Sequence, residues 1–207
     1  DMFRDTFTPR NKMSRFGRLI LCSALLLATS ARATPIKVAS VSASSSFPPE
    51  RGVTYSARQV ADGKQGSAWV EGDAGSGLGS WVEVDLGSEK RLDRMKIWAG
   101  LWYSTDYWAR ANRPKDLELK FSDGSVEMVT LDDEMVAQTV RFAKAVSTST
   151  VRVRVKSIYK GSTWHDTAIS EMQFFDASGG SEFQVSGAVS SSQAETDRDG
   201  NYAVENA

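Results

Sequence analysis

The residues most able to contact a ligand lie in two aromatic-rich stretches that show neither a strand period nor a helix period. One stretch, residues 100–114, reads GLWYSTDYWARANRP, and the other, residues 159–166, reads YKGSTWHD. Aromatic faces stack on the apolar C–H faces of sugar rings, and neighbouring polar side chains hydrogen-bond to hydroxyl groups. We therefore expect a ligand surface made by both loops, unless the first loop folds back and only covers the end of the domain. The candidate contacts are Trp102, Tyr103, Tyr107, Trp108, Trp164, His165 and Asp166.

The chain offers few of the groups that enzymes use as nucleophiles, bases or zinc ligands. It has one histidine, His165, and one cysteine, Cys22. Zinc centres and Cys-His catalysis need more such groups, and a Ser-His-Asp triad would have to use this single imidazole. Carboxylates are plentiful, but the sequence assigns to no pair the spacing that glycoside hydrolysis requires. The composition therefore predicts that the chain is not an enzyme.

The N-terminal segment has the pattern of an export signal. From Met13, which we expect to be the true start, a basic stretch precedes an apolar run and then the small-x-small site Ala31-Arg32-Ala33. Residues 1–33 are therefore interpreted as upstream residues and a signal peptide. The mature chain would begin at Thr34 and would be secreted, periplasmic or on the extracellular surface. A retained anchor, or lipidation at Cys22, is the alternative.

Removal of residues 1–33 would change both the charge and the redox chemistry of the chain. Six of its 25 basic and two of its 26 acidic residues would be lost, which leaves a formal net charge of about −5. A nucleic-acid partner is disfavoured, because phosphate binding needs a basic face. The only cysteine would also be lost, so the domain would contain no disulfide and would depend on sheet packing.

Alternating apolar residues predict β-strands, most clearly at the end of the stretch that organises the domain, residues 62–87. Its last seven residues read WVEVDLG, so Val82 and Val84 fall on one side of a strand and Trp81 on the other. Trp69 and Trp81 both stand next to valines. On that ground both tryptophans are assigned to the core.

Further strands follow at regular intervals. A hairpin is expected between residues 117–121 and 126–131, across the turn Asp123-Gly124. Residues 151–155 have the most regular alternation, and the spacing within residues 92–95 indicates a β-bulge. No segment keeps a helical period over several turns. The pattern predicts an all-β protein with one antiparallel β-sandwich.

Several motifs occur in an order that resembles the discoidin, or coagulation factor C-type, family. They are Asp62-Gly63, Ala68-Trp69, Glu71-Gly72, a glycine-rich loop, WVEVDLG, Asn112-Arg113 and Asp166-Thr167-Ala168-Ile169-Ser170-Glu171. The last two motifs resemble the NADase-type glycan-binding branch of that family, and the resemblance covers residues 36–176. It implies a discoidin-type, galactose-binding-like jelly roll for residues 34–176 and a glycan as ligand. It implies no catalysis, because NAD cleavage belongs to another domain of those proteins.

Three polar residues match the family's motifs one by one. Asn112 and Arg113 correspond to its Asn-Arg pair, and Glu71 corresponds to its Glu-Gly motif. Asn112 and Arg113 would either contact the ligand or fix the loop to the strand that follows Pro114. Glu71, like Asp166, would be either a polar contact or an internal hydrogen-bond anchor.

The resemblance also implies a structural calcium ion, as in many sugar-binding relatives. Asp62, Ser67 and Glu171 stand where those proteins place hard oxygen ligands. Lys64 departs from the pattern, since an acidic or amide residue at this position would favour calcium binding. The resemblance therefore implies a possible structural calcium site, and Lys64 argues against it.

The composition shifts after Asp176 to Ser, Gly and Ala, which is typical of a linker, here residues 177–188. Residues 189–207 faintly repeat residues 42–60. They are interpreted either as the truncated start of a second copy or as an ordinary disordered tail. We therefore expect the chain to be part of a larger multidomain protein.

Three functions remain open from the sequence. The leading prediction is a secreted, non-catalytic carbohydrate-binding module that attaches a larger protein to glycans or to a cell surface. The second is a domain that binds phospholipid headgroups through Trp102 and Tyr103 beside basic residues, although the acidic balance argues against it. The third is an accessory domain of a secreted enzyme whose catalytic part is missing.

Overall fold

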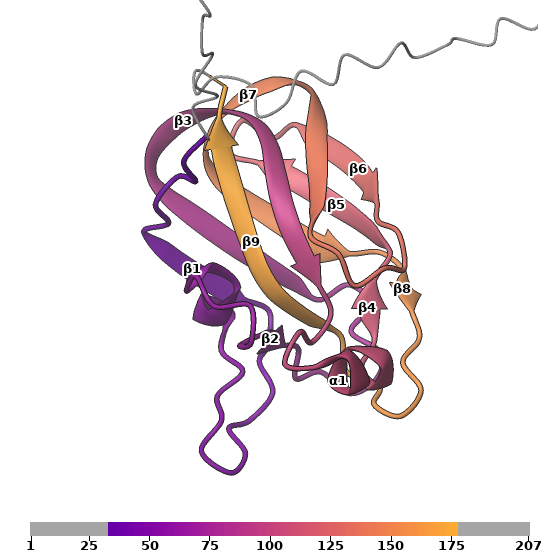
Figure 1. Ribbon diagram of the computed structural model, residues 1–207. Helices are drawn as coiled ribbons and strands as arrows, with labels where there is room; N and C mark the ends of the chain where they lie inside the picture. Colours follow the sequence, from indigo (N-terminus) through magenta and orange to yellow (C-terminus); the bar gives the residue numbers. More distant parts are fainter. Residues whose placement is uncertain (1–32, 178–207) are drawn as a thin grey trace, which may run out of the picture. The chain divides into compact units, whose positions relative to one another are not determined.

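The computed structural model describes residues 33–177, which form a β-rich domain (Figure 1). Apart from Ala33 and Ala177, the predicted signal peptide (1–33), linker (177–188) and tail (189–207) lie outside the described residues. Within the described part, no helix is long and apolar enough to cross a membrane. The elements in chain order are β1 (Ser40–Ala43), the 3-10 helix η1 (Ala57–Ala61), β2 (Trp69–Val70), β3 (Trp81–Ala99), α1 (Thr105–Arg110), β4 (Arg113–Pro114), β5 (Asp116–Phe121), β6 (Val126–Thr130), β7 (Gln138–Val155), β8 (Ile158–Tyr159) and β9 (Ala168–Asp176).

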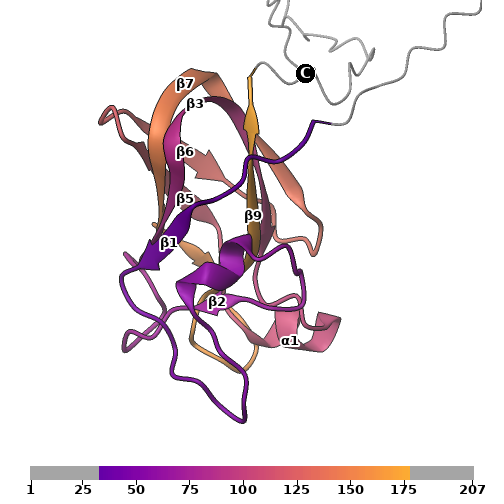
Figure 2. The same ribbon diagram turned by 90° about the vertical axis from the view of Figure 1, so that its left-hand side faces the viewer.

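Two long strands, β3 and β7, run through both layers of the sandwich. The main sheet has the order β2-β9-β3-β7-β5-β6, with β1 paired to β3 beside this path, and β4 and β8 form a separate pair. β1 pairs with residues 82–85 of β3, whereas β9 pairs with residues 92–99 of the same strand. Between these halves the register of β3 and β7 shifts, and both ribbons curve over (Figures 1 and 2). The predicted antiparallel β-sandwich is confirmed.

The core lies between the two layers and consists of the inward side chains that the alternation predicted. Val82 and Val84 of β3 are fully buried, as are the valines of residues 151–155 in β7. The predicted hairpin is confirmed, since β5 and β6 pair around the turn at Asp123-Gly124. The bulge within residues 92–95 is also confirmed by a register shift in the pairing of β3 with both neighbours.

The assignment of Trp81 to the core is wrong. Trp69 is fully buried, but Trp81 is half-exposed on the outer side of β3. There the guanidinium carbon of Arg152 lies 4.1 Å from the centroid of its ring, and Arg152 also pairs with Glu83 at 2.8 Å. Trp81 and Glu83 lie on the same side of the strand. The alternation therefore predicted the outward position of Trp81, and the core assignment was wrong because it relied on residue type.

Residues 100–114 contain a helix, although their sequence shows no helical period. α1 is short, and the Ser104 side chain caps it by accepting a hydrogen bond from the backbone N–H of Tyr107 at 3.2 Å. Asp106 and Arg110, one turn apart, pair at 3.0 Å. A capped helical turn therefore forms within residues 100–114, although their apolar residues show no helical period.

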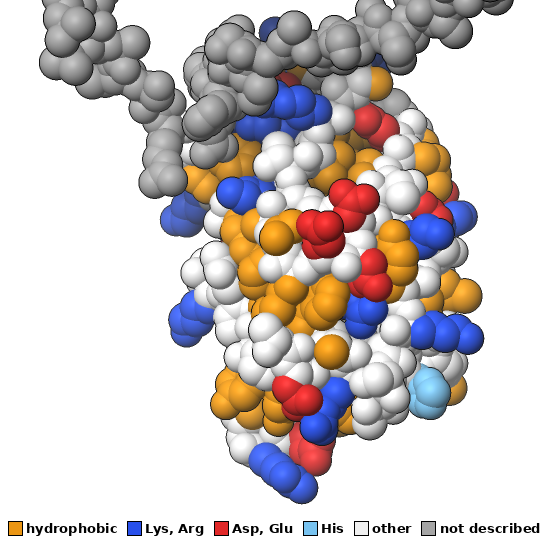
Figure 3. Space-filling model, turned by 45° about the vertical axis from the view of Figure 1, so that its right-hand side comes forward, with side chains coloured by type: hydrophobic (Ala, Val, Ile, Leu, Met, Phe, Trp, Pro, Cys, Tyr) orange, Lys and Arg blue, Asp and Glu red, His pale blue; other side chains and the backbone are white. Residues whose placement is uncertain are grey.

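Charged side chains of both signs are interspersed on the face that Figure 3 presents. Elsewhere charges pair across neighbouring strands, as Arg154 and Lys156 do with Glu118 at 3.8 and 3.5 Å. On this face, therefore, neither sign of charge forms a large continuous patch.

Candidate functional site

Loops at one end of the sandwich enclose a cavity of about 530 Å³. The lining residues come from four separate parts of the chain, residues 47–59, 66–70, 101–111 and 164–166. A volume of this size lies within the usual range for small-molecule sites. Its aromatic and acidic lining consists of Phe47, Glu50, Tyr55, Tyr103, Tyr107, Trp164 and Asp166.

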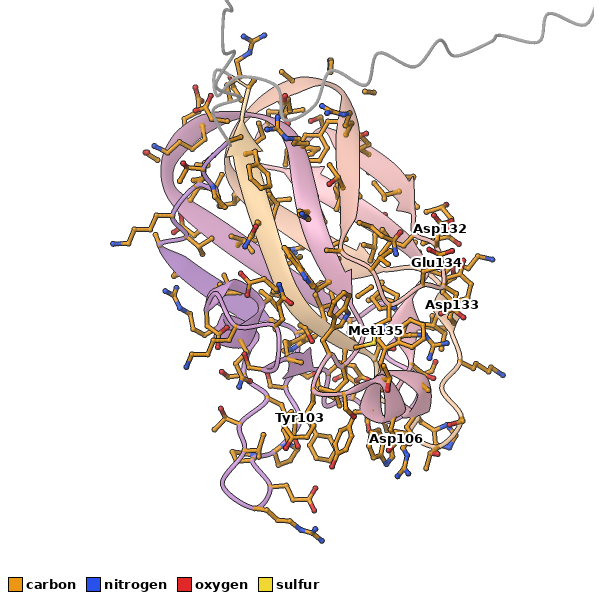
Figure 4. All side chains as sticks on the ribbon, in the orientation of Figure 1. Tyr103, Asp106, Asp132, Asp133, Glu134 and Met135 are labelled. Atoms are coloured by element: carbon orange, nitrogen blue, oxygen red, sulfur yellow. The ribbon has the colours of Figure 1, made fainter. Side chains whose placement is uncertain are left out.

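Two groups of aromatic rings form walls of the cavity. Tyr107 packs against both Tyr103 and Trp164, with ring centroids 4.9 and 5.1 Å apart. Phe47 and Tyr55 meet edge to face, with centroids 5.7 Å apart. Tyr103 is 67% exposed and lies between α1 and the loops that precede β2, so its ring is open to a ligand (Figure 4).

Two predicted contacts, Trp102 and Trp108, do not line the cavity. Their indole N–H groups both donate to the backbone carbonyl of Ala99, each at 2.9 Å. The backbone N–H of Trp102 also donates to the Ser170 hydroxyl at 2.9 Å. These hydrogen bonds connect the start of residues 100–114 to the end of β3 and to the first residues of β9.

Arg113 is buried, and its side chain bonds to several groups of residues 100–114 and of the neighbouring loops. Its guanidinium donates to both carboxylate oxygens of Asp133, at 2.7 and 3.1 Å, and lies 4.3 Å from the ring centroid of Trp108. It also donates to the carbonyls of Trp108 and Ala111, at 3.2 and 2.9 Å. Of the two roles considered for Arg113, these contacts favour the structural one.

Asn112 joins the two predicted loops. Its side-chain amide donates to the carbonyl of His165, and its side-chain oxygen accepts from the backbone N–H of Gly161 at 2.9 Å. A side chain at Gly161 would overlap the backbone of Arg110 and Ala111, so the two loops approach as closely as glycine allows. Asn112 therefore sets the position of the segment that carries Trp164.

We expect Asn112→Ala to lower the free energy of unfolding by about 1–3 kcal/mol, because it removes two hydrogen bonds by which a buried side chain joins the two loops. Ligand binding should weaken as well, since Trp164 would lose its fixed position. Chemical denaturation measures the first effect and titration of the ligand the second. Ser162→Ala, at an exposed position in the same loop, should change neither quantity by much. Equal stability of the two variants would contradict the role assigned to Asn112.

Asp166 lines the cavity, and Glu71 lies close behind it in the interior. Glu71 is fully buried and accepts hydrogen bonds from the backbone N–H groups of Asp73 and Thr167, at 2.8 and 3.3 Å. Burial raises the pKa of Glu71, and the charges of Asp166 and Asp73 raise it further. Burial also raises the pKa of Asp166, against a smaller lowering by His165. His165 itself is exposed and does not line the cavity.

The three candidate calcium ligands lie close together beside the cavity. Asp62 accepts a hydrogen bond from the Ser67 hydroxyl at 2.8 Å, and Glu171 accepts one from the backbone N–H of Gly63 at 3.2 Å. Glu171 is buried, and desolvation raises its pKa to about 7, with a contribution from the charge of Asp62. Within residues 33–177, no three His, Cys, Asp or Glu side chains gather in a metal-binding group. Two carboxylates and a hydroxyl fit a calcium ion, which would need backbone carbonyls as well.

One wall of the cavity was not predicted from the sequence. Phe47, Glu50 and Tyr55 come from the loop around Pro48-Pro49, to which the sequence patterns assigned no function. A bridge between Glu50 and Val53 closes the tip of this loop. The aromatic residues on either side of the Pro-Pro pair, Phe47 and Tyr55, were the available signal. Because they are far from residues 100–114 in sequence, the sequence did not indicate that the two loops line the same cavity.

A jelly-roll-like β-sandwich whose end loops enclose an aromatic cavity defines a discoidin-like domain. Among the families of this class, the chain belongs to the NAD glycohydrolase translocation F5/8 type C domain family, whose model matches residues 33–175. The resemblance noted in the sequence is thereby confirmed. No match was found among curated proteins.

Solved structures with the same fold include several carbohydrate-binding modules. Chitosan-binding module 1 from the chitosanase/glucanase of Paenibacillus sp. IK-5 has a TM-score of 0.51 at 16% identity, covering 69% of this chain and 98% of its own. The family 32 module of C. perfringens NanJ, in complex with galactose, has a TM-score of 0.50 at 18% identity, covering 69% and 98%. A mutant of the lectin binding domain of Lectinolysin, complexed with Lewis b, has a TM-score of 0.50 at 15% identity, covering 70% and 96%.

Proposed function

We propose that this domain binds a glycan in the aromatic cavity and performs no catalysis itself. The observation that carries the proposal is the cavity's lining, which combines the packed rings of Tyr103, Tyr107 and Trp164 with the carboxylate of Asp166. Ring faces suit the C–H faces of sugars, and a carboxylate accepts hydrogen bonds from hydroxyl groups. The sugar ligands of the similar folds support this choice.

The wider role that we propose is attachment. A secreted or surface-exposed module of this kind would hold a larger protein, or the catalytic part of an enzyme, on a glycan-bearing surface. Binding energy concentrated in a few aromatic contacts is sufficient for this purpose, and avidity would increase if several modules acted together. A glycan array probed with the full chain tests the proposal. An array without any bound glycan would overturn it.

Trp164→Ala is expected to weaken glycan binding at least about tenfold, because central aromatic contacts carry much of the binding energy of an interface. Isothermal titration with a glycan found on the array measures the effect. Trp81→Ala is the matched control, since it removes a half-exposed tryptophan outside the cavity. If Trp164→Ala binds as well as the control while both remain folded, the ligand site lies elsewhere.

We also propose that Asp62, Ser67 and Glu171 hold a structural calcium ion, which would stabilise the loops beside the cavity without taking part in any reaction. Glu171 supports this assignment, because a buried carboxylate with a raised pKa gains from a nearby cation. Thermal unfolding with calcium and with a chelator tests it. Equal melting temperatures in the two conditions would refute the site.

A phospholipid surface is the second candidate ligand. Val53 and Tyr103 line the cavity and are 50% and 67% exposed, so a headgroup region could receive them. The mixed charges of Figure 3 offer little attraction to anionic lipid. Co-sedimentation with vesicles that contain phosphatidylserine, combined with a blank glycan array, would favour this function over glycan binding.

A further inference from the structure

We propose that the cavity selects a glycan that carries a protonated amino group, such as an oligomer of glucosamine. This choice of ligand class rests on the glycan-binding function proposed above. It follows from the charges around the cavity and from the faces of its aromatic rings, which together favour a cation over a neutral or acidic sugar.

The cavity has carboxylates whose charge no basic side chain of residues 33–177 compensates by an ion pair. Asp166 lines the cavity. Glu71 lies close enough to interact electrostatically with both Asp166 and Asp73. None of the three takes part in the ion pairs of the described residues. A group of like charges without a counterion makes a negative potential, which a ligand ammonium would relieve.

Two arginines at or beside the cavity already have acidic partners. Arg51, which lines it, lies 3.6 Å from Glu50, and its side chain is 90% exposed. Arg110 lies 5.7 Å from the ring centroid of Trp164 and pairs with Asp106 at 3.0 Å. Both positive charges are thereby compensated. Neither arginine pairs with Asp166, and the exposed His165 lowers the pKa of Asp166 by less than burial raises it.

The aromatic walls favour the same kind of ligand. Tyr103, Tyr107 and Trp164 form a continuous group of tilted rings at the cavity, and the negative faces of such rings attract ammonium groups. The position of Arg110 beside Trp164 is an internal example of this attraction. A sugar ring with an amino group can satisfy both features, since its C–H face stacks while its ammonium meets Asp166.

Two ligands that differ only in this amino group provide the test. Chitosan oligosaccharides carry free amines, and chitin oligosaccharides of the same length carry neutral acetamides. Isothermal titration of the full chain at about pH 6 and low salt should give at least about tenfold tighter binding of the chitosan oligosaccharide. The preference should shrink as salt is added, because screening weakens a charge pair that solvent can reach.

Asp166→Asn is expected to remove most of this preference, because it should weaken binding of the chitosan oligosaccharide much more than binding of the chitin oligosaccharide. Asp132→Asn is the matched control, since it removes the same charge from an exposed residue on another side of the domain (Figure 4). Thermal melts establish that both variants are folded. The salt dependence of the unmodified chain tests the same charge pair without any substitution.

The outcomes separate this inference from the proposed function. Equal binding of both oligosaccharides, or an unchanged preference in Asp166→Asn, would overturn the amino-sugar assignment but leave a glycan-binding domain. Choline chloride binding as tightly as the chitosan oligosaccharide would also overturn it, since the site would then select ammonium groups without a sugar. Absence of binding to any glycan would remove the proposed function and this inference together.

Discussion

Replacement of Trp69 by alanine is expected to lower the free energy of unfolding by about 3–5 kcal/mol, which is usual for the truncation of a buried aromatic side chain. Trp69 is the largest fully buried side chain among the described residues. Its indole N–H donates to the carbonyl of Ser45 at 2.8 Å, so the substitution also leaves that carbonyl without its partner. Denaturant unfolding measures the loss.

Trp81→Ala is the appropriate control for this prediction. Its ring is half-exposed and is covered mainly by the side chain of Arg152, so we expect a loss of about 1 kcal/mol. The two tryptophans stand twelve positions apart in sequence, and the structure assigns them to opposite environments. Similar losses for the two variants would show that burial does not distinguish them.

The strands were predictable because their residues alternate. Residues 81–86, 117–121 and 151–155 all bury every second side chain, as the sequence indicated. Trp81 was misassigned because residue type was given more weight than strand phase. A tryptophan can cover the outer face of a sheet when a cation lies on its ring, and the sequence does not reveal such a partner in advance.

The site was predictable only in part, because it combines loops that are distant in sequence. Tyr107 and Trp108 are neighbours, yet only Tyr107 lines the cavity, since a helix turns their side chains in different directions. Ser104 and Asp106 were signals of a helix start, but the stretch lacks an apolar period. Phe47 and Tyr55 could not be assigned, because only the folded chain brings their loop to α1.

The polar residues of the family motifs show a second limit of the sequence. Asn112, Arg113 and Glu71 are all buried and bond to backbone groups or to other side chains of this chain. A motif residue that holds a loop and one that contacts a ligand have the same sequence signature. Their burial and their partners distinguish the two roles, and both become visible only in the structure.

Raising the pH through Glu171's titration range is expected to destabilise the domain by about 3 kcal/mol when a chelator removes calcium. Burial raises the pKa of this carboxyl from 4.5 to about 7 in the folded state. Between these two values the folded chain binds more protons than the unfolded chain, so stability falls as pH rises. The magnitude follows from about 1.4 kcal/mol for each unit of pKa.

Glu171→Gln isolates this effect from other titrating groups. The amide keeps the size and polarity of the protonated carboxyl but does not ionise, so its stability should change less between about pH 5 and pH 8. Asp116 and Asp123, whose pKa values are lowered by hydrogen bonds from hydroxyl groups, act in the opposite direction below about pH 4. They are present in both proteins, so the difference between the two stability curves reports on Glu171.

Calcium provides the second arm of this experiment. A cation bound by Asp62 and Glu171 would favour the ionised carboxylates, so the loss of stability above pH 5 should become smaller when calcium replaces the chelator. Glu171→Gln should lose most of that calcium effect, because it removes a charged ligand. If the unmodified chain shows the same pH dependence with calcium and with chelator, Glu171 titrates as an isolated buried acid. The calcium site would then be refuted, while the pH dependence would stand.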